Sequence, residues 1–249
     1  MAGTSHAQMI GEALRRAGQR VSGRSLPSHV VNSWRRCIDE YGLQPDRVRL
    51  PNVLTRAELA QVSAPIEDLI ALARPEVERL LLRLRAFGFI VTLAERGAAV
   101  VMHRGDGPLP EAFSTARNVL GAVCREDRQG TGGISTCLRE ARPLVVDRDE
   151  HFDARVTDFT CVAAPIAGVA GETAAVLNAS CWRRDGHVAP ALALDVVGQS
   201  ARRIANRVFA LRHVGRRVVR VSRFDDFADI SVEGRFALDS SDQIGRAHV

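Results

Sequence analysis

Residues 121–182 read GAVCREDRQGTGGISTCLREARPLVVDRDEHFDARVTDFTCVAAPIAGVAGETAAVLNASCW. The pattern of apolar and small residues predicts a helix over 130–140, a strand over 143–146, and two strands joined at Gly168 and Gly171. Two apolar strands on either side of a glycine turn are typical of a β-hairpin. This segment therefore predicts an antiparallel sheet with a helix beside it.

The rest of the chain adds helices and one more hairpin to this core. Helices are expected over residues 5–21, 28–41, 57–62, 64–88 and 190–211, with a short one within 104–120 and a second hairpin over 89–93 and 98–102. Thr55 and Glu58 match a capping box at the start of the third helix, and Ser28 is expected to cap the second. Pro75 is expected to kink or restart the fourth helix.

The composition is that of a folded globular chain without a membrane-spanning segment. Hydrophobic residues make up 46% of the 249 residues, and no apolar run approaches the roughly 20 residues that cross a bilayer. Because the N-terminus also lacks the apolar core of a signal peptide, we expect a cytoplasmic protein. All 34 basic residues are Arg and are dispersed along the chain, which indicates codon bias in a GC-rich genome rather than a surface for nucleic acid.

The cysteines are odd in number and irregularly spaced. They are Cys37, Cys124, Cys137, Cys161 and Cys181, and neither a C-x-x-C pair nor a Cys/His pattern for zinc occurs. We therefore expect buried, reduced thiols and no metal site. A redox sensor that uses Cys124 and Cys161 is the alternative, and the reactivity of these thiols would decide between the two.

Nucleophilic chemistry would need a thiol beside a base, and Cys161 with His151 is the pair to consider. Cys161 begins an apolar strand, however, where a small thiol packs well. We therefore expect no catalytic residue and expect His151 to order its loop through a backbone hydrogen bond. The turn Gly130–Gly133 lacks the ending of a P-loop and the spacing of a dinucleotide fingerprint, so we expect it to pack tightly rather than to bind an anion.

Several short motifs follow one another over most of residues 28–212. They are Ser33-Trp34-Arg35-Arg36-Cys37 with Tyr41-Gly42-Leu43-Gln44-Pro45, Gly130-Thr131-Gly132-Gly133-Ile134-Ser135-Thr136, His151-Phe152, Cys161-Val162-Ala163-Ala164-Pro165-Ile166, and Gly171 with Ala175-Val176-Leu177-Asn178-Ala179-Ser180. In this order they resemble the N-terminal GAF sensor region of sigma-54-dependent transcriptional activators, and the acetoin-catabolism regulators most of all.

The resemblance implies an α+β fold in four parts. Residues 1–62 would be an N-terminal helical segment, 63–212 a GAF domain whose antiparallel sheet is flanked by helices, 213–242 a linker with the start of a PAS-like domain, and 243–249 an adapter-derived tail. The PAS-like start is inferred from Phe236-Ala237-Leu238-Asp239. The tail is inferred from back-translation of residues 243–249, which resembles a sequencing adapter and would make the chain a truncated product.

A small-molecule pocket is expected between the sheet and the helix over 131–140, since such pockets are mostly apolar with a few aimed polar groups. By motif position, the candidate ligand-binding residues are Cys124, Arg128, Thr131, Ser135, Cys137, His151, Cys161 and Asn178. The family usually has Asn where this chain has Gly132, and Gly where it has Ser135, so the family's ligand is not carried over. A different ligand and a cavity packed shut both fit this pattern.

The resemblance implies a sensing function rather than an enzyme. In such activators a GAF domain restrains or releases an ATPase that remodels sigma-54 RNA polymerase, and a helix-turn-helix binds DNA; this chain contains neither a P-loop nor a GAFTGA-type loop. We expect a small-molecule ligand, no cofactor, and a homodimer through the helix over 190–211, although a helix that only covers the sheet explains the same apolar stripe. The sensor region of a histidine kinase is the alternative.

Overall fold

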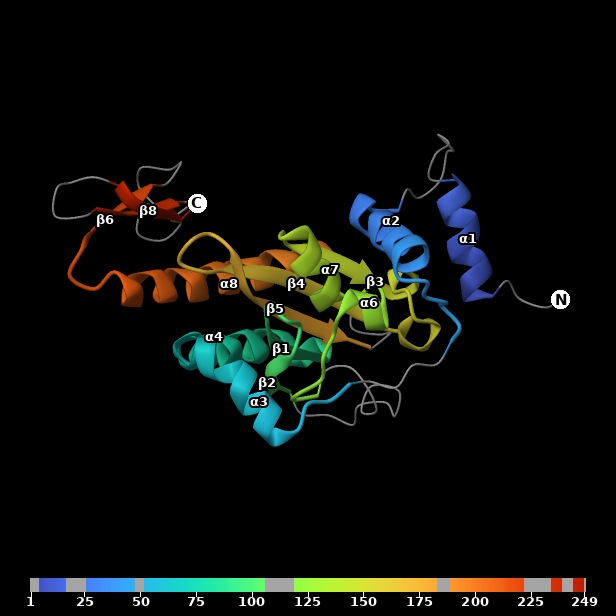
Figure 1. Ribbon diagram of the computed structural model, residues 1–249, viewed down its shortest axis with the longest axis horizontal. Coiled ribbons are helices and arrows are strands. Elements are labelled where there is room, and N and C mark those ends of the chain that lie inside the picture. Colours follow the sequence, from blue (N-terminus) through green and yellow to red (C-terminus); the bar gives the residue numbers. More distant parts are fainter. Residues whose placement is uncertain are drawn as a thin grey trace.

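A five-stranded antiparallel sheet forms the centre of the molecule (Figure 1). The computed structural model describes residues 5–16, 26–47, 52–105, 119–182, 189–221, 234–238 and 244–248. The strands are β1 (Phe89–Glu95), β2 (Val100–Arg104), β3 (Leu144–Asp147), β4 (Thr160–Ala167) and β5 (Thr173–Cys181), in the spatial order β2-β1-β5-β4-β3. The β1–β2 and β4–β5 hairpins and the α+β fold class are confirmed, whereas most of the helix expected within 104–120 lies outside the described residues.

The register of β1, β5 and β4 brings polar residues together on one face of the sheet. Asn178 of β5 lies opposite Thr92 of β1, and Ser180, two residues further along β5, lies opposite Cys161 of β4. Since side chains on a strand alternate between the two faces, Asn178 and Ser180 point the same way. Leu177 and Ala179, the residues adjacent to Asn178, are fully buried on the opposite face.

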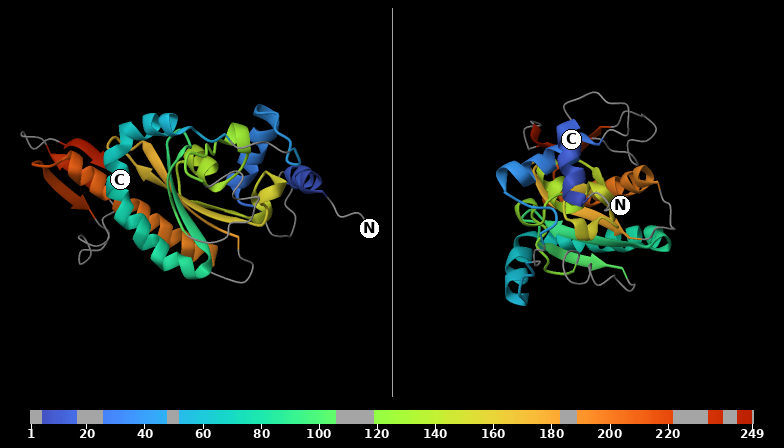
Figure 2. Two further views of the ribbon diagram at one scale, coloured as in Figure 1. Left: turned by 90° about the horizontal axis from the view of Figure 1, so that it is seen from below. Right: turned by 90° about the vertical axis from the view of Figure 1, so that its right-hand side faces the viewer.

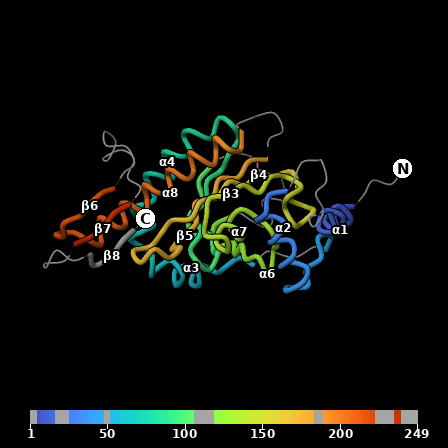
Figure 3. The backbone as a smooth tube through the Cα atoms, turned by 90° about the horizontal axis from the view of Figure 1, so that it is seen from above, coloured from blue at the N-terminus to red at the C-terminus, as the bar shows by residue number. Residues whose placement is uncertain are grey.

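Two long helices cover that opposite face. These are α4 (Glu67–Leu84) and α8 (Pro190–Arg212), which lie side by side (Figures 2 and 3). Val197 and Ile204 from the predicted apolar stripe of α8 are fully buried against the sheet, while Leu192 is 59% exposed. Among the described residues, no helix is long and apolar enough to cross a membrane.

The capping box expected before α4 is present. At the start of α3 (Arg56–Ser63), the Thr55 hydroxyl accepts a hydrogen bond from the Glu58 N–H, and the Glu58 carboxylate accepts one from the Thr55 N–H. A turn of 3-10 helix over Ala64–Ile66 separates α3 from α4. α4 does not restart at Pro75, because the buried residues on either side of that proline hold the helix against the sheet.

Short helices cover the face that carries Asn178. These are α6 (Glu126–Gln129) and α7 (Gly133–Glu140), and α7 packs across β3, β4 and β5. Ile134 and Cys137 of α7 belong to a second apolar cluster with side chains from the sheet. The helix therefore begins three residues later than the sequence predicts, and residues 130–132 form a turn that faces the sheet.

The N-terminal helices pack beside α7, at the end of the molecule opposite the C-terminus (Figure 1). They are α1 (His6–Arg16) and α2 (Ser28–Arg35), and α2 continues as a turn of π-helix over Arg36–Glu40. The cap predicted at Ser28 is wrong, because Pro27 occupies that position without a side-chain hydrogen bond and Ser28 is already helical. The buried apolar residues of this layer are Ile10, Val30, Trp34, Cys37, Leu43 and Phe152.

A second, three-stranded sheet lies beyond the far end of α8 (Figure 1). Its antiparallel strands are β6 (Arg217–Val221), β7 (Gly234–Leu238) and β8 (Ile244–His248), in that spatial order. β7 contains most of the segment expected to start a PAS-like domain, and β8 lies within residues 243–249. The PAS assignment and the boundaries of the four parts stay predictions.

A buried carboxylate joins α4 to α8. Glu76 is fully buried, and its carboxylate accepts hydrogen bonds from Ser200 Oγ at 2.9 Å, from Arg203 at 3.1 Å and from Arg79 at 2.7 Å. A charge in the interior is tolerated only where such partners replace its water. Glu76 therefore fixes how the two helices lie against one another.

We expect Glu76→Gln to lower the free energy of unfolding by about 2 kcal/mol, because the amide would accept weaker hydrogen bonds than the buried carboxylate does from Ser200, Arg79 and Arg203. Urea denaturation followed by circular dichroism measures this change. Asp68→Asn is the matched control, since Asp68 pairs with Arg212 across the same two helices at 3.2 Å with both side chains more than half exposed. It should cost less than about 1 kcal/mol, and equal losses in the two variants would contradict the role assigned to Glu76.

Candidate functional site

A small cavity lies between the start of α7, the His151 loop and the inner face of β4 and β5. Its volume is about 50 Å³. This is room for about three to five water-sized groups. The lining residues are Cys124, Gln129, Gly130, Gly132, Gly133, Ile134, Ser135, His151, Val156, Phe159, Cys161 and Asn178. None of these side chains carries a fixed charge.

The turn before α7 closes on the sheet because two glycines leave no room for side chains. Gly130 has a φ of 74°, and a Cβ there would lie 2.6 Å from the Cβ of Phe152. A Cβ at Gly133 would lie 2.5 Å from Asn178 Oδ1 and 2.8 Å from the Cβ of Cys161. The glycine-rich sequence thus serves close backbone approach, as expected, and that approach forms one wall of the cavity.

Two amide side chains present unpaired atoms to this cavity. Asn178 is 1% exposed; its Nδ2 donates to Thr92 Oγ1 at 3.1 Å and to Ser180 Oγ at 3.0 Å. Within the described part of the chain, Asn178 Oδ1 and Gln129 Nε2 are buried and have no hydrogen-bond partner. Buried polar atoms are nearly always paired, so this acceptor and this donor mark a place where a small polar molecule would fit.

His151 and Cys161 form a hydrogen-bonded pair in the same wall. His151 Nδ1 lies 3.0 Å from the carbonyl oxygen of Arg148, which can only accept, so Nδ1 carries the proton. In the neutral ring Nε2 is then an acceptor, and it lies 3.3 Å from the Cys161 sulfur, whose S–H donates to it. The backbone hydrogen bond predicted for His151 is confirmed, and it turns the basic nitrogen toward the thiol.

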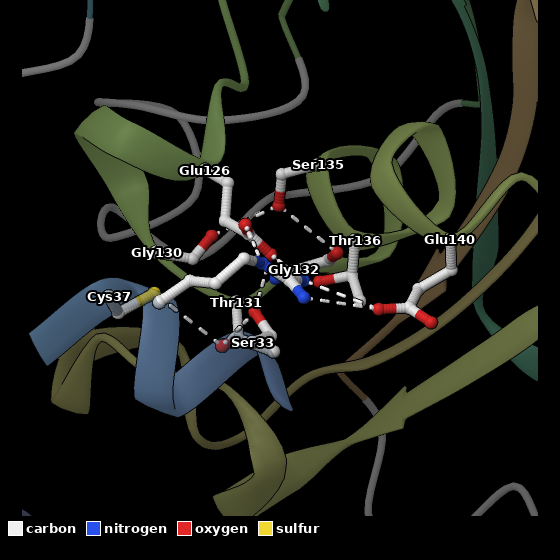
Figure 4. Close-up of polar contacts among 10 residues, drawn as sticks. Ser33, Cys37, Glu126, Gly130, Thr131, Gly132, Ser135, Thr136 and Glu140 are labelled. Atoms are coloured by element: carbon white, nitrogen blue, oxygen red, sulfur yellow. Dashed lines mark hydrogen bonds and ion pairs between the residues drawn. The ribbon is translucent and has the colours of Figure 1, made fainter. Parts of the chain in front are cut away.

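A polar network joins α2 to the other side of the glycine turn (Figure 4). Ser33 Oγ donates to Glu126 Oε1 at 2.6 Å and lies 2.7 Å from Thr131 Oγ1. Arg36 donates to both oxygens of Glu126, at 2.8 and 2.9 Å, and also pairs with Glu140 at 3.3 Å. Hydrogen bonds to Glu126 raise the pKa of Arg36, so the guanidinium stays charged at any working pH.

The N-terminal helices also bind the backbone around His151. His6 Nε2 lies 2.9 Å from the His151 carbonyl oxygen, and Trp34 Nε1 donates to the Glu150 carbonyl oxygen at 3.0 Å. His29 Nε2 lies 2.7 Å from the Val145 carbonyl oxygen on β3. The cavity wall and the position of α1 and α2 are therefore held by the same segment of chain.

Five of the eight candidate residues line the cavity, and three do not. The five are Cys124, Ser135, His151, Cys161 and Asn178. Thr131 is buried toward Ser33 instead, because Gly130 turns the chain before it. Cys137 lies one helical turn after Gly133, in the apolar core, where its thiol donates to the Arg142 carbonyl oxygen. Arg128 lies on the exposed side of α6.

The sequence did not identify Gln129 or the aromatic and aliphatic lining residues. Gln129 is the last residue of a four-residue helix, where no periodic pattern says which way a side chain points. Val156 and Phe159 lie in an irregular loop between β3 and β4. The alternation of β5, by contrast, would have indicated that Ser180 shares a face with Asn178.

Two of the other cysteines are poor candidates for chemistry. Burial raises the pKa of the Cys37 thiol to about 12, and the negative charge of Glu126 acts in the same direction. Burial also raises the pKa of the Cys137 thiol to about 12. All five cysteines are buried and none forms a disulfide. Within the described ranges, no group of three or more His, Cys, Asp or Glu side chains is placed to hold a metal ion.

A second, larger depression lies on the outside of α6 and α7. Its volume is about 290 Å³, and it is open to solvent. It is lined by charged groups of both signs, among them Arg125 and Asp127, which pair with one another at 2.8 Å. The smaller cavity is the better candidate site because its lining combines apolar side chains with buried polar atoms that have no partner in the described chain.

The fold and the matched relatives place the chain among the N-terminal regions of bacterial transcriptional regulators. The chain belongs to the family described as MimR, N-terminal domain, whose model matches residues 4–204. It is 30% identical to the acetoin catabolism regulatory protein of Cupriavidus necator over 216 residues, which are 86% of this chain and 32% of that protein. The resemblance to acetoin-catabolism regulators is thereby confirmed.

Two further matches agree with this family. The chain is 27% identical to the acetoin dehydrogenase operon transcriptional activator AcoR of Bacillus subtilis, over 83% of this chain and 33% of that protein. It thus spans about a third of the length of either curated relative. The crystal structure of the E. coli DhaR(N)–DhaL complex matches with a TM-score of 0.66 and 16% identity over 75% of this chain and 62% of that chain, a likeness of fold.

We expect Glu126→Gln to loosen α2 specifically, because Arg36 would lose the charge it faces in a largely buried site. The free energy of local opening for amides in residues 28–40 should fall by about 3 kcal/mol in hydrogen exchange, while amides of β4 and β5 keep their protection. Asp127→Asn is the control, since its partner Arg125 is 58% exposed. A uniform loss of protection over the whole chain would contradict a role in holding α2.

The docking of α2 should weaken in acid through His29. Burial lowers the pKa of His29 below 6.5, and the charge of Arg142 acts in the same direction, against the hydrogen bond to Val145. The folded state therefore favours the neutral His29 ring, whose Nδ1 accepts a hydrogen bond from Arg142 at 3.2 Å. As the pH falls, His29 of the unfolded chain is protonated before His29 of the folded chain. The stabilising contribution of His29 is complete above pH 6.5 and decreases below it, toward the lowered pKa of the folded state.

The measurement is the free energy of unfolding of wild type minus that of His29→Gln, taken from pH 8 to pH 5. Gln can still donate to the Val145 carbonyl oxygen but does not titrate, and the other titrating groups cancel in the difference. We expect the difference to favour wild type less as the pH falls below 6.5. A difference that is flat with pH would exclude this role for His29.

Proposed function

We propose that this chain is the sensing region of a bacterial transcriptional regulator and that its cavity binds a small, neutral, oxygen-containing molecule. The observation that carries the proposal is the pair of unpartnered buried atoms on residues that line one cavity, the donor Gln129 Nε2 and the acceptor Asn178 Oδ1. A ligand with one acceptor and one donor would satisfy both. Because the lining has no fixed charge, an ionised ligand would pay a large desolvation cost there.

The size of the cavity limits the class of ligand. About 50 Å³ accommodates a few heavy atoms, and the apolar part of the lining, including Ile134, Val156 and Phe159, suits a short carbon chain. Small ketones, diols and phenols therefore form the range to screen, with phenols at its upper limit of size.

Ligand binding would act on the N-terminal helices through the two segments that line the cavity and also hold α1 and α2. The glycine turn carries Thr131, which lies beside Ser33, and the following loop offers the His151 carbonyl oxygen to His6. A ligand that shifts either segment would alter contacts with α1 and α2 and thereby change their docking. Such a ligand must bind the two arrangements with different affinity.

In the whole protein we expect this change to control an ATPase that acts on sigma-54 RNA polymerase at DNA. Under this proposal residues 63–212 are a GAF domain, and the exposed residues of α8, including Leu192 at 59% exposure, contribute to a homodimer. The relatives are named a catabolism regulatory protein and an operon transcriptional activator, which favours a transcriptional regulator over the histidine-kinase alternative. The sensing region itself would act without a cofactor and without catalysis.

A specific ligand should raise the melting temperature in proportion to the logarithm of its concentration. At 100 times its Kd it would stabilise the fold by about 2.7 kcal/mol. We expect Gly133→Ala to abolish this stabilisation, since the added Cβ would meet Asn178 Oδ1 at 2.5 Å and disrupt the cavity. The measurement is a thermal-shift screen of small ketones, diols and phenols against wild type, Gly133→Ala and Gly198→Ala.

Gly198→Ala on α8 is the matched control, because its added Cβ would meet nothing closer than 3.8 Å. It should keep the response to every ligand that stabilises wild type. A screen in which no compound of these classes stabilises wild type, or in which Gly133→Ala responds as wild type does, would refute binding at this cavity.

A further inference from the structure

The thiol of Cys161 lines the cavity and is hydrogen-bonded to an oriented base. Its sulfur lies 3.3 Å from His151 Nε2, and the His151 ring is held by the Arg148 carbonyl oxygen on its other nitrogen. A nucleophile, a base and a group that orients the base are the arrangement found where a thiol is activated. A purely structural cysteine would need no base at this position.

The hydrogen bonds around Cys161 run in one direction. Asn178 Nδ2 donates to Ser180 Oγ at 3.0 Å, and the Ser180 hydroxyl, which can donate as well as accept, lies 3.3 Å from the Cys161 sulfur. The thiol proton in turn points to His151 Nε2. The sulfur thus receives a hydrogen bond from Ser180 and gives its proton to His151, which favours the thiolate form during attack.

We propose that this site captures a small aldehyde reversibly as a thiohemiacetal on Cys161, an inference that rests on the proposed function and names its ligand class. The Cys161 sulfur forms a bond to the carbonyl carbon, and the electron pair of the C=O π bond moves to the oxygen. The thiol proton passes to His151 Nε2 and then to that oxygen, which becomes a hydroxyl. Every atom of thiol and aldehyde is kept, so the step needs no oxidant, reductant or leaving group.

The two unpartnered atoms of the cavity match the start and the end of this step. An aldehyde oxygen can only accept a hydrogen bond, and Gln129 Nε2 is a buried donor without a partner in the described chain. The adduct has a hydroxyl that can donate, and Asn178 Oδ1 is the corresponding acceptor. Donors aimed at the oxygen where negative charge develops are what such an addition requires.

The cysteines differ in their position relative to the cavity. Cys124 is a second thiol in the lining, while His151 Nε2 is hydrogen-bonded to Cys161. Cys37 and Cys137 lie outside the lining and in apolar clusters. Cys137 therefore provides the matched control, as a buried thiol that does not contact the cavity.

The test is carbon-13 NMR of the full chain with propanal labelled at the carbonyl carbon. Wild type and Cys137→Ser should give one new protein-bound resonance, one per chain, for a saturated carbon that carries both oxygen and sulfur. Cys161→Ser should lack it, and hydroxylamine, which consumes free aldehyde, should remove it from wild type. His151→Gln should slow its formation by about 100-fold or more, as expected for loss of a positioned base.

Whether capture occurs at all is decided in wild type alone, so that part of the test does not depend on the folding of any variant. If propanal and 1-propanol, which cannot form the adduct, raise the melting temperature equally and no such resonance appears, capture is overturned while binding at the cavity stands. If the resonance persists in Cys161→Ser, the assigned thiol is wrong. If propanal neither binds nor forms an adduct, aldehyde capture is overturned, and the screen of ketones, diols and phenols still decides the proposed function.

Discussion

The site depends on one steric constraint, the close approach of the turn at Gly130–Gly133 to the sheet and to the His151 loop. At Gly133 a Cβ would meet both Asn178 and Cys161, and at Gly130 it would meet Phe152. The turn can therefore lie against both surfaces only without side chains at these two positions. Its inner side forms the cavity wall, and its outer side carries Thr131 to α2.

This constraint explains why binding and helix docking would be linked. Besides their buried apolar cluster, the N-terminal helices are held by directed polar contacts, namely the Arg36–Glu126 pair, the Ser33–Thr131 contact and the bonds to backbone carbonyls near His151. Polar contacts of this kind depend steeply on distance and angle. A small shift of the glycine turn would therefore weaken the interactions of α1 and α2 more than it would weaken the apolar contacts between the sheet and α8.

The sequence predicted the architecture because its main signals are local. The apolar runs of β4 and β5 on either side of a glycine turn, the Thr55–Glu58 capping box and the apolar stripe of α8 are each visible in a continuous stretch of sequence. The structure differs from the prediction where the position of a side chain depends on contacts with residues distant in the sequence. Thr131 points away from the cavity toward Ser33, 98 residues earlier, and Glu76 is buried because Ser200, 124 residues later, can pair with it. Gln129 was missed for the same reason, since a four-residue helix gives its side chains no periodic direction.

The central claim is that the unpartnered amide atoms of Gln129 and Asn178 are the groups a ligand meets. An NMR titration that follows the side-chain amide resonances of these two residues tests it most directly, using any compound that stabilises the fold. We predict that both resonances shift with the same apparent Kd as the stabilisation, and that amides of residues 28–40 shift with them. Shifts confined to α4, α8 or the three-stranded sheet, with both side-chain amides unmoved, would contradict the account.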